Sequence, residues 1–156
     1  MKYSYKNISG ANAEDLIAGV DIRKSKTPAP ALKTVTVSKC RITNTYSASV
    51  TVDIFLEAID IDATIKLYGS INNNYDSDNN TYITSVKNTY YLLKGVILPV
   101  GATLEALGGS SCVFSNQYSL KIQQGDVAST SDVLLEYEEV RTSLTSDSAR
   151  RSINQY

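Results

Sequence analysis

Apolar and polar residues alternate along most of residues 32–140, and no helical period occurs in that range. In the clearest segment, residues 50–57, valine, isoleucine and leucine occupy every second position. Half-buried antiparallel strands give this alternation, whereas the buried strands of a parallel sheet read as continuous apolar runs. About eight such segments predict an all-β fold, an antiparallel two-sheet β-sandwich of jelly-roll type, with a barrel as the alternative.

Bulge and turn signals divide these strands. The alternation slips near Ser38 and Lys39, which predicts a β-bulge there. Residues 44–47 have the composition of a turn. Further along, Pro99 presets φ for the first corner of a turn and Gly101 fits its exit. We therefore expect two strands to meet at this second turn.

The ends of the chain differ from its middle. A length of 156 residues suits one domain with extensions. Residues 12–19 carry helix-capping signals for at most about two helical turns, and residues 25–30 contain two prolines typical of a linker. Residues 141–156 are rich in serine and threonine. We expect a β-sandwich at 32–140 between extended arms at 1–31 and 141–156.

Each arm is either a mobile tail or a segment that packs on a partner. The N-terminal arm has enough apolar surface to favour packing, and the C-terminal arm has arginines suited to pairing with carboxylates. The residues expected to bind a partner are Tyr3, Tyr5, Leu16, Ile17, Arg150, Arg151 and Tyr156.

The composition indicates a protein without catalytic residues. The chain has no histidine, which removes the usual general base and the common zinc ligand sets, and it has no glycine-rich phosphate loop. With 15 basic and 16 acidic residues, it lacks the basic surface that nucleic acid or an anionic membrane would require. Because the N-terminus has no apolar signal region, we expect intracellular synthesis. No cofactor, metal, nucleic acid or membrane partner is expected.

Two features raise the question of a calcium site and of a disulfide bond. Residues 69–81 are rich in Asn and Asp, whose oxygens suit Ca²⁺, but they lack the spacing of an EF-hand, so a solvated loop is the expectation. Cys40 and Cys112 lie in apolar strand-like positions and are expected to be free thiols, although the sequence leaves a bridge between them open.

Four segments carry a resemblance to known proteins. They are SVTVDIFL at 49–56, YYLLKGVILPVGATL at 90–104, YSLKI at 118–122 and SDVLL at 131–135. In this order, following the pair Asn44-Thr45, they resemble the small β-sandwich virion accessory proteins of tailed bacteriophages. The resemblance covers about residues 32–140, without the arms, and its most specific part is the turn from Leu98 to Leu104.

The resemblance implies a non-enzymatic virion structural protein, expected to be a capsid decoration or cement subunit made in the host cytoplasm. Its expected partners are the major capsid protein or other virion subunits, and a homo-oligomer, trimer or hexamer, suits virion symmetry. One alternative is a neck, tail or baseplate subunit. The other is a glycan- or host-surface-binding module whose sugars stack on aromatic rings, with Tyr75, Tyr82, Tyr90 and Tyr91 as candidates.

Overall fold

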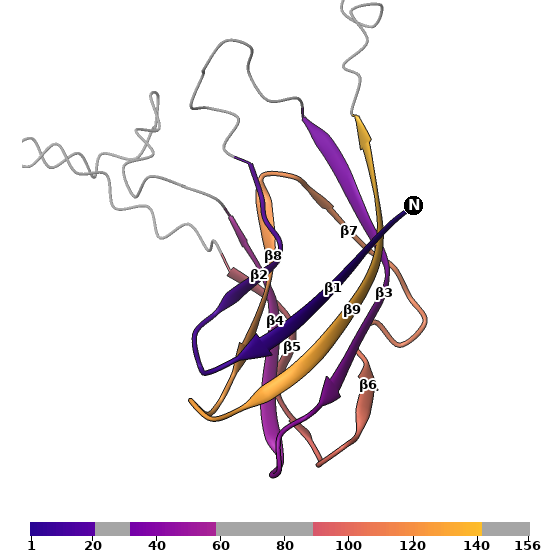
Figure 1. Ribbon diagram of the computed structural model, residues 1–156. Helices are drawn as coiled ribbons and strands as arrows, with labels where there is room; N and C mark the ends of the chain where they lie inside the picture. Colours follow the sequence, from indigo (N-terminus) through magenta and orange to yellow (C-terminus); the bar gives the residue numbers. More distant parts are fainter. Residues whose placement is uncertain (21–31, 59–88, 142–156) are drawn as a thin grey trace, which may run out of the picture.

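The computed structural model describes residues 1–20, 32–58 and 89–141 (Figure 1). These residues form nine strands and no helix, so none of them belongs to a helix that could span a membrane. The strands are β1 (Lys2–Ser9), β2 (Glu14–Ile17), β3 (Lys33–Asn44), β4 (Val50–Ala58), β5 (Thr89–Leu98), β6 (Thr103–Glu105), β7 (Cys112–Ser115), β8 (Tyr118–Gln124) and β9 (Thr130–Arg141).

The strands form two antiparallel sheets, neither of which closes into a barrel. Sheet A has the order β1-β9-β3-β6, with β7 also paired to β3, and sheet B has the order β2-β8-β4-β5. The pairing is nested along the chain, because β1 pairs with β9, β2 with β8, β3 with β6 and β7, and β4 with β5. The prediction of an all-β, antiparallel two-sheet fold is confirmed at this level.

The hydrophobic core lies between the sheets, which gives a sandwich-like arrangement. Alternate residues of each strand face inward, and the longest strands, β3 and β9, supply the most regular examples. Sheet A contributes Ile8, Val35, Val37, Cys40, Ile42, Phe114, Val133 and Leu135, and sheet B contributes Leu16, Ile17, Val50, Val52, Ile54, Leu98, Leu120 and Ile122.

The short helix expected at residues 12–19 is wrong. Residues 14–17 form β2 instead, which pairs with β8, and the segment before them forms β1 at the edge of sheet A. A register shift between Asp15 and Ile17 lets the neighbouring Leu16 and Ile17 both reach the core. Burial of these side chains stabilises the strand more than the capping signals could stabilise a helix of about two turns, since helices this short have little stability of their own. Thus residues 1–20 add a strand to each sheet, and the linker at 25–30 lies outside the described residues.

The predicted bulge in β3 is confirmed, because the register with β9 shifts between Val37 and Lys39. The turn after β5 is also confirmed: the Ala102 amide donates to the Pro99 carbonyl at 3.1 Å, and Gly101 has φ of 69°. Pro99 is the first residue of this turn and not its corner. The strands on either side belong to different sheets, so the turn joins the two sheets and does not form a hairpin.

Buried amide side chains fasten the end of the molecule that holds the tight turns, here called the turn end and shown at the bottom of Figure 1. Asn44 is 1% exposed, and its Nδ2 donates to the carbonyls of Ala48, Leu98 and Pro99 at 2.8, 2.9 and 3.1 Å. Its Oδ1 accepts from the Tyr46 amide at 2.8 Å. One side chain therefore joins the β3–β4 turn to the β5–β6 turn.

Gln124 has the equivalent role for the other two turns. Its Nε2 donates to the carbonyls of Gly10 and Ser129, both at 3.2 Å, and its Oε1 accepts from the Ser131 hydroxyl at 2.6 Å. Because Ser131 lies opposite Asn44 in the β9–β3 register, the two amide clusters are neighbours. The four turns β1–β2, β3–β4, β5–β6 and β8–β9 are thus connected by hydrogen bonds of uncharged side chains.

The opposite end, here called the exit end, is where the chain leaves the described residues. Lys33 pairs with Arg141, and Glu57 pairs with Thr89. The Val20 amide donates to the Asn116 carbonyl at 2.7 Å, and the Asn116 amide donates to the Lys33 carbonyl at 3.0 Å. The segments 21–31, 59–88 and 142–156 are consequently all connected to the two sheets at this one end (Figure 1).

Candidate functional site

A hollow lies on the outer face of sheet A, crossing β1, β9, β3 and β6. Its volume is about 540 Å³, within the range of about 300–1,000 Å³ typical of small-ligand sites. We call it the sheet A hollow; it is lined by Tyr5, Lys6, Asn7, Arg41, Thr43, Thr103, Asp132, Val133 and Leu134.

Strand register explains why these residues meet. Tyr5 lies opposite Leu134, which lies opposite Arg41, so the three form one row across the sheet. The next row on the same face contains Asn7, Asp132, Thr43 and Thr103. Residues two apart on a strand share a face, so both rows point away from the core.

Polar contacts hold the lining of the hollow in place. Asn7 Nδ2 donates to Asp132 Oδ1 at 2.8 Å, and the hydroxyls of Thr43 and Thr103 are 2.8 Å apart. Arg41 Nε donates to Glu105 Oε2 at 3.2 Å. Each contact uses part of the capacity of its side chains, since a carboxylate accepts about four hydrogen bonds and a guanidinium donates five.

The outer face of sheet B carries a packed aromatic cluster. The rings of Phe55 and Tyr91 have centroids 5.4 Å apart, and Lys94 Nζ lies 4.6 Å from the centroid of the Tyr91 ring. Phe55 is only 5% exposed although it follows the inward Ile54. Next to this cluster, Lys121 Nζ lies 3.1 Å from Glu57 Oε1.

Two of the tyrosines proposed from the sequence as a sugar platform, Tyr90 and Tyr91, do not lie together. Tyr91 packs on Phe55, whereas the preceding residue on the strand, Tyr90, packs edge-on against Tyr118 with centroids 6.2 Å apart. Adjacent strand residues point to opposite faces, so the two rings cannot stack on one ligand. Tyr75 and Tyr82 lie outside the described residues.

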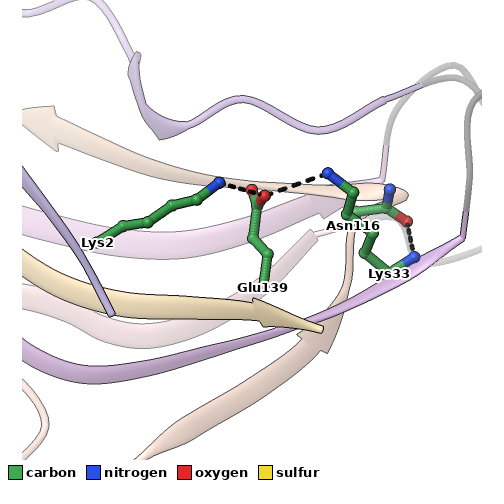
Figure 2. A network of polar contacts seen from close by, with 4 residues as sticks. All are labelled: Lys2, Lys33, Asn116 and Glu139. Carbon is green, nitrogen blue, oxygen red and sulfur yellow. Dashed lines mark hydrogen bonds and ion pairs between the residues drawn. The ribbon is translucent and has the colours of Figure 1, made fainter. Parts of the chain in front are cut away.

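An ionic cluster ties three strands at the exit end (Figure 2). Glu139 Oε2 accepts from Lys2 Nζ at 2.6 Å and from Lys33 Nζ at 3.3 Å. The backbone amide of Lys33 donates to Asn116 Oδ1 at 3.0 Å. The hydrogen bond from Lys2 lowers the pKa of Glu139 below its ordinary value of 4.5 and raises the pKa of Lys2.

The residues expected from the sequence to bind a partner fall into three groups. Tyr3 and Tyr5 are 59% and 71% exposed on the outer face of sheet A, where they are open to contact. Leu16 and Ile17 are buried in the core of their own domain. The remaining three, Arg150, Arg151 and Tyr156, lie outside the described residues.

Sequence reasoning missed most of the sheet A hollow. Asn7, Arg41, Thr43 and Asp132 each occupy an outward position of an alternating strand, and only that weak signal is present in the sequence. The order of the strands in the sheet brings them together, and nothing local encodes that order.

The two cysteines are free thiols, as expected. Burial raises the pKa of Cys40 to about 12, and burial also raises the pKa of Cys112, so both thiols stay protonated near neutral pH. In the part of the chain that the structure describes, no three metal-ligating side chains gather. The Asn- and Asp-rich loop at 69–81 lies outside that part.

Comparison with known proteins finds no matching family model, no matching curated protein and no matching solved structure. A function for this chain therefore has to be inferred from its own residues and geometry.

Proposed function

We propose that the chain is a non-enzymatic structural protein of a bacteriophage virion, specifically a capsid decoration or cement subunit, built on a jelly-roll β-sandwich. The nested pairing supports the jelly roll. β6 and β7 both pair with β3, so they can be counted as one strand, which gives eight strands. The first of these pairs with the last, the second with the second to last, and so on to the middle of the chain. Jelly rolls occur in viral capsid and lectin domains, which supports the virion role by analogy of fold.

The observation that carries the proposal is the placement of the exit end. Lys33 pairs with Arg141 in sheet A, and Glu57 pairs with Thr89 in sheet B. These pairings place the points where the chain continues into 21–31, 59–88 and 142–156 at one end of the two sheets. A subunit with this layout can present its attachment segments to a shell on one side while the turn end faces away. The proposed arms are therefore 21–31 and 142–156, shorter than expected from the sequence.

Attachment would depend on what the arms bury. Ordering a segment costs about 1–2 kcal/mol per residue of backbone entropy, so an arm binds only if it buries apolar groups or forms strong polar contacts. In the C-terminal arm, Arg150 and Arg151 are proposed to pair with carboxylates, and Tyr156 to act as an aromatic anchor. The proposed partners are the major capsid protein and sister subunits of a trimer or hexamer in the virion.

Deletion of residues 142–156 tests this role. Because β9 ends at Arg141, the truncated chain keeps every strand of sheets A and B and is expected to fold. Capsids lacking the subunit should bind the full chain in co-sedimentation and should not bind the truncated chain. The substitution of Arg150 and Arg151 by alanine should weaken binding. Lys94→Ala, which removes a cation from the outer face of sheet B, serves as the control.

The outcomes separate the parts of the proposal. Unchanged binding of the truncated chain would show that the C-terminal arm does not attach the subunit. Failure of the full chain to bind capsids would contradict the decoration role. A neck, tail or baseplate subunit would instead occur at about 6–12 copies per virion, as in a closed ring, and quantitative mass spectrometry of virions distinguishes this from hundreds of copies.

A further inference from the structure

The sheet A hollow combines an apolar floor with polar walls. Leu134 lies in the row between Tyr5 and Arg41 and is half-buried, so it forms the floor. Tyr5, which is 71% exposed, stands on the edge strand and gives the hollow an aromatic wall. The row of Asn7, Asp132, Thr43 and Thr103 supplies amide, carboxylate and hydroxyl groups beside this apolar surface.

Two cationic side chains, Lys6 and Arg41, and two carboxylates, Asp132 and Glu105, lie in or beside the hollow, so their formal charges sum to zero. Arg41 contacts the carboxylate of Glu105, and the carboxylate of Asp132 accepts a hydrogen bond from Asn7. Lys6 belongs to the lining, but its Nζ donates to the backbone carbonyl of Asp15 in β2, which directs the ammonium toward sheet B. Because positive and negative groups around the hollow are equal in number, an ion of either sign would gain little net attraction here.

A ligand that fits this lining has an apolar face for Tyr5 and Leu134 and several groups that both donate and accept hydrogen bonds. A pyranose ring has these properties, since its C–H face packs on an aromatic ring while its hydroxyls pair with planar carboxylate and guanidinium groups. We propose that the sheet A hollow binds a neutral sugar unit of a glycan. This site is independent of the arms, lies on different residues from the tyrosines considered from the sequence, and adds a binding activity to the proposed virion role.

Titration of the full chain with monosaccharides, followed by amide chemical shifts in NMR spectra, tests the site. The probes are methyl α-glucopyranoside, methyl α-mannopyranoside, methyl β-galactopyranoside and N-acetylglucosamine, each up to about 50 mM, because single sugars form few contacts and bind with Kd of about 1–10 mM. At least one probe should give saturable shifts at Tyr5, Asn7, Arg41, Thr43 and Asp132.

Variants of the wall and of the polar row sharpen the test. Tyr5→Ala should weaken binding by about tenfold and Tyr5→Phe should largely preserve it, since the ring supplies the contact. Asp132→Asn should weaken binding by a similar factor, because it removes a charged acceptor. Tyr3→Ala is the matched control, since Tyr3 lies on the same strand and face but outside the lining, and it should leave the Kd unchanged.

Two results would overturn the inference. The first is the absence of saturable shifts in the hollow with all four sugars. The second is saturable binding of a charged probe, inorganic phosphate or putrescine, with no response to the sugars, because it would contradict the balanced charge. Neither result bears on capsid binding by the arms, which co-sedimentation measures separately.

Discussion

Replacing Asn44 by alanine should cost about 4 kcal/mol of the free energy of unfolding. Of its four side-chain partners, the Leu98 carbonyl is buried, and leaving it without a donor costs about 1–3 kcal/mol. The other three partners, at Tyr46, Ala48 and Pro99, are partly exposed and lose about 0.5–1 kcal/mol each, because water replaces part of the bond. This loss is large against a total stability of about 5–15 kcal/mol.

Equilibrium urea denaturation followed by far-ultraviolet circular dichroism measures this loss, since the chain has no tryptophan to report by fluorescence. Asn7→Ala is the matched control, because Asn7 is exposed and makes one side-chain bond, to Asp132, so its loss should be below about 1 kcal/mol. If Asn44→Ala costs no more than this control, the buried amide does not fasten the turn end.

A second substitution at the same position tests the direction of the hydrogen bonds. Asn44→Asp keeps the volume but replaces the Nδ2 donor by an acceptor facing three carbonyls, so near neutral pH it should be at least as damaging as alanine. Burial raises the pKa of such a carboxyl, and protonation in acid supplies one donor again. The deficit relative to the unsubstituted chain should therefore shrink as pH falls, and a deficit independent of pH would contradict the assigned donors.

Three further predictions concern other parts of the domain. Gly101→Ala should cost about 1–2 kcal/mol from its φ of 69° alone, since space around the site is open, whereas the neighbouring Val100→Ala should cost less in the same urea titration. Glu139→Gln should lower the free energy of unfolding near neutral pH. Because the pKa of Glu139 is lowered in the folded state, the difference in stability between the variant and the unsubstituted chain should vanish as the pH is lowered from 4.5 through that folded pKa. A difference that stays constant with pH would exclude the ionic contribution. Cys40, with a pKa of about 12, should react with a disulfide reagent only after unfolding, whereas the partly buried Cys112 should react first; rapid modification of Cys40 in the native protein would contradict its burial.

Local sequence signals predicted the features that depend on neighbouring residues. The bulge between Val37 and Lys39 was visible because a slip in alternation has one structural meaning. The turn at Gly101 was visible because few residues adopt a positive φ. The same reasoning failed at residues 14–17, where capping signals indicated a helix but pairing with β8 and burial of Leu16 decided for a strand.

Features that depend on distant segments were not predictable from the pattern. Nothing in the turn composition of residues 44–47 indicates that Asn44 is buried, and the burial of Asn44 and Gln124 follows from carbonyls supplied by other turns. The sheet A hollow has the same origin, since Tyr5, Arg41 and Asp132 come from three strands far apart in the sequence. Their adjacency is set by strand order, which a single sequence does not encode locally.

The place of β9 between β1 and β3 has a consequence for synthesis. A nascent chain that has not yet released residues 130–141 from the ribosome lacks the strand between β1 and β3, so these two strands have no shared neighbour to join them. Pairing of Lys2 with Tyr137 also closes almost the whole polypeptide into one loop, which makes folding slow for a domain of this size. The domain is therefore completed only after translation has passed its last strand, and until then its unpaired edges are open to chaperones and to other unfinished copies.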